Sequence, residues 1–158
     1  MTMARTLQEY LAHKGIAYDL LPHRRTDTSI NSAHSAHIPA DRLAKPVILE
    51  DEDGYVMVVI PANRHVRIGR LNQLLNRRMG LATEAELTPL FGDCDPGAVP
   101  PLGDAYGIAT VVDESLDQCP DVYLEAGDHE DLIHLKGSAF RRLMRGSQHA
   151  RLCKPRET

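Results

Sequence analysis

Apolar side chains recur with a helical period near the start of this 158-residue chain. Leu7, Tyr10 and Leu11 lie three and four residues apart, which predicts an amphipathic helix over residues 6–14. Gly15 follows directly, and glycine is the residue that most often ends a helix. We therefore expect the chain to begin with a helix that buries one face.

Apolar runs between the expected helices predict strands. The clearest pair covers residues 46–49 and 55–60, and Asp53 with Gly54 between them is typical of a hairpin turn. Shorter runs predict four further strands, at residues 16–20, 108–112, 122–125 and 132–135. Because strands and helices alternate and a hairpin is present, we expect an α/β fold of mixed α+β type around a mixed sheet.

Helical spacing and capping residues predict the remaining helices, near residues 31–37, 68–75, 84–90 and 139–145. Thr83 and Glu86 form a capping box before the third of these, and Ser138 is a candidate N-cap for the last. Residues 92–103 contain three glycines and three prolines, which excludes a helix or an inner strand. A loop of this length in a small domain is usually functional.

Length and composition indicate one globular domain. Hydrophobic residues make up 42% of the chain and charged residues 25%, the ordinary balance for a folded protein. We expect the domain to span residues 1–146 and to be followed by a basic tail, residues 147–158, that frays.

Charge and residue usage argue against several partners. A formal net charge of −4 and an aromatic content of 4% do not fit a general coat for DNA or for an anionic membrane. No apolar run is long enough to span a membrane, and the first residues lack a secretory signal. Cys94, Cys119 and Cys153 are widely spaced and odd in number, which fits reduced thiols in a cytoplasmic protein.

Motifs for common cofactors and nucleophiles are missing from the sequence. It has no glycine-rich nucleotide loop, no Gly-x-Ser-x-Gly elbow, and neither the Cys-x-x-Cys nor the His-Glu-x-x-His motif. We therefore expect no cofactor and no bound metal. Because the chain has eight histidines, one alternative stays open, a small-molecule or metal-binding protein that uses His34, His37 and Cys94.

Three places have a local context that suits chemistry. Lys45 precedes a strand, where its ammonium could meet a phosphate, and a solvated boundary lysine is the plain alternative. The loop from Gly97 to Gly103 could donate backbone N–H groups to a carbonyl or oxyanion, or serve only as a rigid connection. His129 lies in a turn and could act as acid, base or donor, or be a turn histidine without a role.

Arginines gather in two parts of the sequence, and each set is a candidate phosphate-binding face. The alternative for both sets is ordinary solvated helix surface. The sets are Arg64, Arg67, Arg70, Arg77 and Arg78, and Arg141, Arg142 and Arg145.

Seven short segments follow one another in a recognisable order. They are GIAY from residue 15, AHIP from 36, LAKPV from 43, DGY from 53, GAVPPLG from 97, VDES from 112 and GDH from 127. This order resembles the YbaK/EbsC and prolyl-tRNA-synthetase editing-domain family of aminoacyl-tRNA deacylases, over residues 6–145. The resemblance implies a curved mixed sheet surrounded by helices. It also implies a free-standing editing hydrolase whose partner is the acceptor end of a mischarged aminoacyl-tRNA, with an aminoacyl-tRNA synthetase as a candidate second partner.

The resemblance assigns roles to the lysine and the loop. Lys45 matches the family's lysine, which neutralises a phosphate near the terminal adenosine, and Pro46 lies beside it. Gly97 and Pro101 match the loop whose backbone holds the substrate carbonyl and the ribose. The rest of this loop is expected to border the substrate, at Ala98, Val99, Pro100, Leu102 and Gly103.

The resemblance also assigns the last segment to the amino-acid pocket. Gly127 and His129, with Asp128 between them, match a Gly-x-His segment that contributes to selectivity or water placement. The Gly-Asp-His and Pro-Pro-Leu triplets are similar to the alanine-editing branch rather than to the branch acting on Cys-tRNA. One departure is Pro46, where the alanine branch more often has Asn or Thr.

The expected reaction is therefore hydrolysis of a mischarged ester, with alanine on tRNA(Pro) as the first candidate. Loop N–H groups would stabilise the carbonyl oxygen, and the substrate's own hydroxyl or amine would orient water. The remaining alternative is a non-catalytic module of the same fold that binds tRNA or an aminoacyl group.

Overall fold

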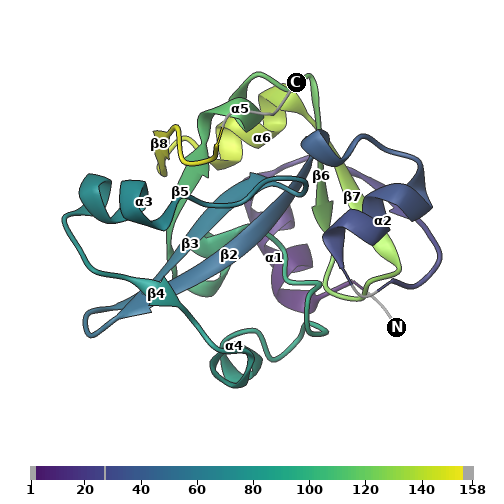
Figure 1. The fold of residues 1–158 in the computed structure, drawn as a ribbon. Coiled ribbons are helices and arrows are strands. Elements are labelled where there is room, and N and C mark those ends of the chain that lie inside the picture. Colours follow the sequence, from purple (N-terminus) through teal and green to yellow (C-terminus); the bar gives the residue numbers. More distant parts are fainter. Residues whose placement is uncertain (1–2, 27, 155–158) are drawn as a thin grey trace.

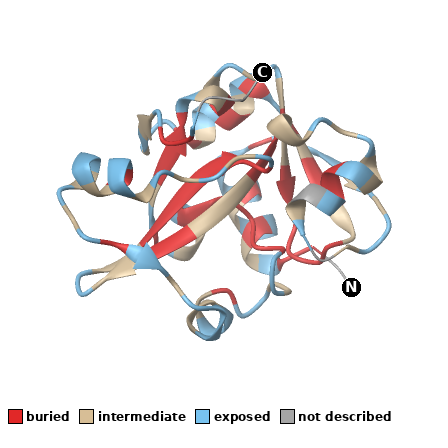
Figure 2. Ribbon diagram, in the orientation of Figure 1, coloured by how far each residue is buried: buried red, intermediate tan, exposed pale blue. Residues whose placement is uncertain are grey.

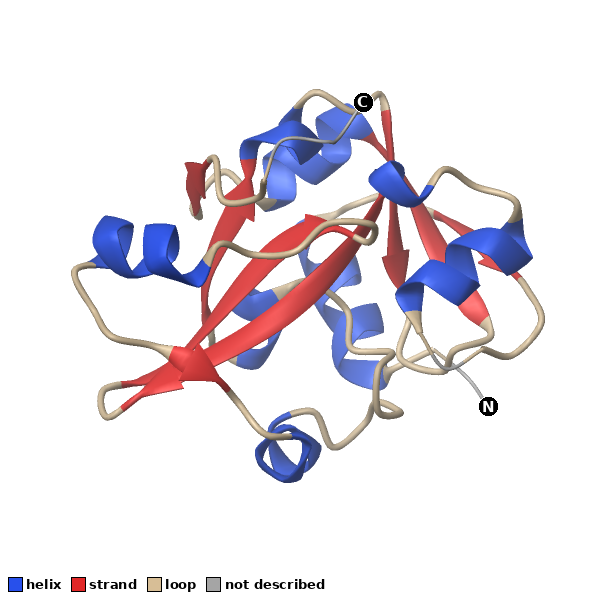
Figure 3. Ribbon diagram, in the orientation of Figure 1, coloured by secondary structure: helices blue, strands red, loops and turns tan. Residues whose placement is uncertain are grey.

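The described part of the chain, residues 3–26 and 28–154 of a computed structural model, forms one mixed sheet with helices around it (Figures 1 and 3). The strands are β1 (Asp19–Pro22), β2 (Leu43–Asp51), β3 (Gly54–Pro61), β4 (Gly80–Leu81), β5 (Ala109–Asp113), β6 (Asp121–Glu125), β7 (Asp131–Lys136) and β8 (Gln148–Ala150). Their order across the sheet is β1-β7-β6-β2-β3-β5-β8, and β4 pairs separately with β2. The mixed α/β fold expected from the sequence is confirmed.

Helices cover both faces and the ends of this sheet (Figure 1). The α-helices are α1 (Arg5–Lys14), α2 (Ser29–Ala36), α3 (Ile68–Leu75), α4 (Glu84–Leu90), α5 (Glu114–Asp117) and α6 (Gly137–Leu143). Two short 3-10 helices are η1 (Ala40–Arg42) and η2 (Gly103–Tyr106). Among the described residues, no helix combines the length and the apolar character that a membrane span requires.

The hairpin of β2 and β3 is the centre of the core, as the buried positions in Figure 2 show. Met57 and Val59 face the side covered by α1, which contributes Leu7 and Leu11, both fully buried. On the other face, Leu71 of α3 packs in a second apolar cluster. The predicted helix of residues 6–14 is confirmed, because its apolar stripe is the face that packs on the sheet.

Several expected boundaries are wrong. β2 starts at Leu43 rather than residue 46, so Lys45, which was expected to precede the strand, lies inside it and pairs with Ile60 of β3. β1 starts at Asp19 rather than residue 16, because its ladder with β7 pairs only Asp19–Pro22. The last helix starts at Gly137, one residue before the expected cap Ser138. β7 leads directly into this helix, and a side chain at Gly137 would meet the Cys119 carbonyl oxygen at 2.1 Å.

The expectation of a frayed tail is wrong for the described residues after Gly146. β8 adds a parallel strand to β5, and Leu152 is fully buried. The carboxylate of Asp113 accepts hydrogen bonds from the Leu152 N–H at 2.8 Å and the Cys153 N–H at 3.3 Å. The C-terminal segment is therefore held to the sheet by a buried carboxylate as well as by apolar burial.

Strand pairing is interrupted along one edge of β2. Its other edge pairs with β3 from Ala44 to Asp51. On the interrupted edge, β6 pairs with residues 43–44 and β4 with residues 49–50. No strand of the described chain pairs with residues 45–48 there. The Ile48 carbonyl accepts a hydrogen bond from the Ala82 N–H on this edge. Because backbone groups alternate between the two edges of a strand, the even-numbered residues of β2 direct theirs to this edge. The missing N–H of Pro46 therefore costs the β2–β3 ladder no hydrogen bond.

We predict that Asp113→Ala destabilises the fold. The substitution leaves two backbone N–H groups of the C-terminal segment without their acceptor. A hydrogen bond to a charged group contributes about 1.5–3 kcal/mol to stability. Urea unfolding of Asp113→Ala and of the exposed control Glu52→Ala measures this loss. A loss no larger than that of the control would contradict the assigned role.

Candidate active site

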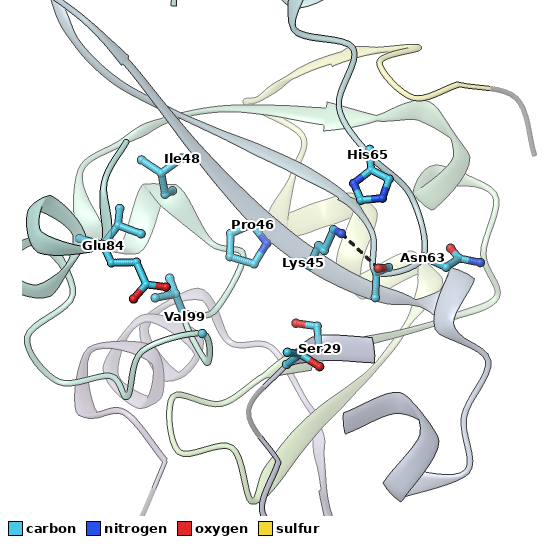
Figure 4. A pocket seen from close by; sticks show the side chains of 12 residues that line it. Ser29, Lys45, Pro46, Ile48, Asn63, His65, Glu84 and Val99 are labelled. Carbon is cyan, nitrogen blue, oxygen red and sulfur yellow. Dashed lines mark hydrogen bonds between the residues drawn. The ribbon is translucent and has the colours of Figure 1, made fainter. Parts of the chain in front are cut away.

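A cavity of about 540 Å³ lies at the interrupted edge of β2 (Figure 4). Lys45 and Pro46 of β2 line it, together with Gly97 and Val99 of the long loop. Side chains of successive strand residues point to opposite faces of a sheet. Lys45 and Pro46 nevertheless line the same cavity, because no strand pairs with this edge of β2 and separates the two faces. The missing partner strand therefore creates the space.

Lys45 contributes the cationic group of the cavity. Its Nζ donates a hydrogen bond to the Ala62 carbonyl oxygen at 3.1 Å, and it makes no other hydrogen bond with a described residue. An ammonium has three donors, so two remain for a ligand. Burial lowers the pKa of Lys45, with the nearby Cys153 acting in the opposite direction. An ammonium that has lost part of its hydration gains more from an incoming anion than an exposed lysine does.

The loop contributes backbone donors at the cavity wall. Gly97 has φ of +79°, a conformation that favours glycine. The N–H of Ala98 is used inside the loop by the Asp95 carbonyl at 3.1 Å. The N–H groups of Gly97 and Val99 have no hydrogen-bond acceptor among the described residues. The loop thus has two free N–H donors, at Gly97 and Val99, with the hydrogen-bonded N–H of Ala98 between them.

The segment 127–129 supports this loop from behind. His129 is buried, and its Nε2 hydrogen-bonds to the carbonyl oxygen of Pro96. The Gly127 carbonyl accepts from the Asp95 N–H at 2.8 Å. Gly127 has φ of +101°, and a Cβ there would lie 2.7 Å from the Cβ of Ala4. The segment fixes residues 95–96 and so fixes where Gly97 lies.

The structure brings only some of the predicted site residues to the cavity. Lys45, Pro46, Gly97 and Val99 line it. The others lie outside the lining, and all of them are buried: Ala98, Pro100, Pro101, Leu102, Gly103, Gly127, Asp128 and His129. Their predicted contact with substrate stays a prediction.

Eight lining residues could not be singled out from the sequence, and two of them, Ile48 and Ala62, are apolar neighbours of Pro46 and of the Lys45 ammonium. The other six come from the start of α2, the segment after β3 and helix α4, and they are Thr28, Ser29, Asn63, His65, Glu84 and Leu87. The capping box that opens α4 was visible in the sequence. What the sequence did not reveal is that the helix packs beside the open edge of β2.

A smaller cavity of about 90 Å³ adjoins the first. The two share Glu84, Leu87, Gly97 and Val99, and Phe91 adds an aromatic wall to the smaller one. Its largely apolar lining and small volume suit a short aliphatic side chain.

The residues of the metal alternative do not form a ligand set. No group of three or more His, Cys, Asp or Glu side chains in the described part of the chain is arranged to hold a metal ion, which applies to His34, His37 and Cys94 as well. Cys94 instead contacts the Tyr106 hydroxyl at 3.2 Å, and burial raises the pKa of its thiol to about 12. A thiol with so high a pKa is a poor nucleophile at neutral pH.

Part of each arginine set is engaged within the protein. Arg77 binds the Asp51 carboxylate through Nε at 2.6 Å, and its guanidinium makes a second contact there. Arg141 and Arg142 donate to the carbonyls of Asp117 and Gly15. None of these three lines the cavity. The phosphate-binding role of either face stays a prediction.

Comparison with known proteins identifies the family. The chain matches the family model of the aminoacyl-tRNA editing domain over residues 23–143, most of its length, and it belongs to this family. No curated protein matches the chain.

Two solved structures show the same fold. One, named a "putative trans-editing enzyme for prolyl tRNA synthetase", is 23% identical with a TM-score of 0.83, over 96% of this chain and 97% of that chain. The other, a hypothetical protein, is 25% identical with a TM-score of 0.83, over 95% of this chain and 100% of that chain.

A buried carboxyl near the supporting segment gives a test of the site's electrostatics. Burial raises the pKa of Glu125 from 4.5 to about 7, and the charge of Asp128 adds to the shift. A raised folded-state pKa means that the folded protein binds the proton more tightly than the unfolded chain. Stability from this group is therefore present below about pH 4.5 and is lost as pH rises through 7.

We predict that Glu125→Gln removes this pH dependence. Between pH 4.5 and 8 the wild type should lose roughly 2–3 kcal/mol of unfolding free energy relative to Glu125→Gln. Urea unfolding at several pH values measures the difference, with the exposed Glu52→Gln as the control. A constant difference between Glu125→Gln and wild type across this range would contradict a raised pKa.

Proposed function

We propose that this chain is a trans-editing deacylase that hydrolyses the ester of a mischarged aminoacyl-tRNA. One observation carries the proposal, a cavity with an under-used ammonium at Lys45 and free loop donors at Gly97 and Val99. Membership of the editing-domain family makes an aminoacyl-tRNA the substrate class that fits this cavity. The name of the structural neighbour favours tRNA(Pro).

Lys45 would bind a phosphate next to the terminal adenosine. Asn63 and His65 line the cavity on the Lys45 side, away from Glu84 (Figure 4), and their polar side chains suit contact with a nucleotide. Phosphate is the acceptor that best replaces the hydration lost by a half-buried ammonium. This contact would place the ester of the terminal ribose against the loop.

The loop N–H groups would bind the ester carbonyl oxygen as charge develops on it. One such donor contributes about 2.7–4 kcal/mol to lowering a barrier of this type. No nucleophile activated by a paired base is found among the described lining residues, so the attacking water would be oriented by the ribose hydroxyl or the substrate amine. His129 would act through the loop by holding the Pro96 carbonyl, as a positioning residue.

Selection of a small amino acid would come from the adjoining cavity of about 90 Å³. Leu87, Phe91 and Val99 bound it, so a methyl group fits and a bulky or cyclic side chain overlaps the wall. Alanine is therefore the proposed acyl group, and correctly charged Pro-tRNA(Pro) would be spared.

We predict that Lys45→Ala lowers kcat/KM for Ala-tRNA(Pro) by about 10- to 100-fold, the range expected for one hydrogen bond between charged groups. Deacylation of Ala-tRNA(Pro), Cys-tRNA(Pro), Ser-tRNA(Ala) and Pro-tRNA(Pro) by wild type and Lys45→Ala measures this. Lys136→Ala is the matched control, because it removes an exposed lysine outside both cavities.

Turnover of one mischarged ester that depends on Lys45 and not on Lys136 is the expected result. If folded wild type hydrolyses none of these esters, the deacylase proposal fails, and a module that binds aminoacyl-tRNA without turnover replaces it. If Lys45→Ala keeps full activity, the phosphate contact is wrong.

A further inference from the structure

The larger cavity carries opposite charges at its two ends. Figure 4 shows Lys45, His65 and Asn63 at one end and Glu84 with Ile48 at the other, with Pro46 between them. Glu84 is the only carboxylate among the described residues that line this cavity. A cavity with separated charges fits a ligand that has an anionic group and a cationic group at a similar separation.

Glu84 is an exposed residue whose backbone is positioned by a helix and whose carboxylate the protein does not use. It is the first residue of α4, directly after the N-cap Thr83. Glu86 closes the capping box and also accepts a hydrogen bond from the Tyr55 hydroxyl at 3.1 Å. The Glu84 carboxylate, by contrast, has no hydrogen bond or ion pair with a described residue. Two carboxylates in one helical turn thus differ: Glu86 is structural and Glu84 is free.

Glu84 also borders the smaller, apolar cavity. It lies with Leu87 and Val99 where the two cavities meet. In an amino acid, the side chain and the ammonium are attached to the same carbon. A carboxylate at the mouth of a side-chain pocket is therefore placed where the ammonium of a bound aminoacyl group must lie.

The other carboxylate near this place is already neutralised. Asp95 lines only the smaller cavity, and its Oδ2 accepts from Arg25 at 3.1 Å. Arg25 also donates to the Asp128 carbonyl at 3.2 Å, so its guanidinium is fixed on the loop. Asp95 is thus part of the loop's support, and Glu84 is left as the acceptor for a cation.

We propose that Glu84 binds the α-ammonium of the aminoacyl group and makes the enzyme selective for esters that carry a free amine. The inference rests on the proposed function, because it assigns the acyl group to the Glu84 end of the same cavity. Lys45 and Glu84 then bind the two charges of one substrate, the phosphate and the ammonium. An acyl group without that positive charge would lose one of the two contacts and would leave the carboxylate without a partner.

Alanyl-tRNA and lactyl-tRNA test this, because a hydroxyl replaces the ammonium with little change of size. The measured quantity is the ratio of kcat/KM for the alanyl ester to that for the lactyl ester. Comparing this ratio between wild type and Glu84→Gln cancels the different intrinsic reactivity of the two esters. Glu114→Gln is the matched control, since Glu114 is also an exposed first residue of a helix and lies outside both cavities.

We expect Glu84→Gln to lower the ratio by about 10-fold or more, through slower alanyl hydrolysis with lactyl hydrolysis nearly unchanged. Glu114→Gln should leave the ratio at the wild-type value. A Glu84→Gln ratio equal to that of the wild type overturns the proposal. So does an equal loss on both esters, which would indicate a general base or a purely structural role.

Failure of the proposed function gives a different result. In that case wild type hydrolyses neither ester, and calorimetry with the two uncleavable 3′-amide analogues of adenosine 5′-phosphate decides about Glu84. Tighter binding of the alanyl than of the lactyl amide that disappears in Glu84→Gln supports the ammonium site. Equal or absent binding overturns it.

Discussion

The site depends on the interrupted pairing along one edge of β2. β6 joins β2 for only two residue pairs and β4 for two more, which leaves residues 45–48 without a strand partner on that side in the described chain. A continuous ladder would bury Lys45 and Pro46 on opposite faces of a closed sheet. The interruption lets both reach one space, and β3 still supports the same residues from the other edge. A rigid strand thus presents a cation at an opening in its own sheet.

The second wall of the cavity is a loop that the protein fixes from behind. His129 and Gly127 bind the backbone of residues 95–96, and Arg25 ties Asp95 to the carbonyl of Asp128. These contacts cover the part of the loop just before Gly97. The free N–H groups at the cavity therefore directly follow a segment that is fixed by hydrogen bonds, which is the arrangement that preorganised donors require.

Local patterns in the sequence were enough for most of the fold. The α1 stripe, the β2–β3 hairpin and the capping box of α4 depend on neighbours close in sequence, and each formed as expected. β8 escaped prediction because three exposed or half-exposed residues carry no apolar alternation, and its pairing with β5 joins segments far apart in the chain. The site likewise depends on contacts between segments far apart in the chain, which local patterns do not reveal.

Lys45 and the loop were visible as motifs, whereas Glu84 and His65 reach the cavity only through long-range packing. The order of short segments along the chain indicated the family, and the family match bears this out. It did not indicate which loop residues face the cavity. Ala98, Pro101 and Leu102 belong to the recognisable motif, yet they are buried and lie outside the cavity lining.

The binding place of an uncleavable substrate analogue tests most directly whether the open edge of β2 is the active site. Alanine joined by an amide to the 3′ position of adenosine 5′-phosphate can be titrated into ¹⁵N-labelled protein while amide shifts are followed. We predict saturable shifts centred on the amides of Lys45, Gly97 and Val99, at the open edge of β2. Saturable shifts centred instead on the groove of Tyr18, Lys136 and Arg142, with the amides at the open edge of β2 unchanged, would contradict an active site at that edge.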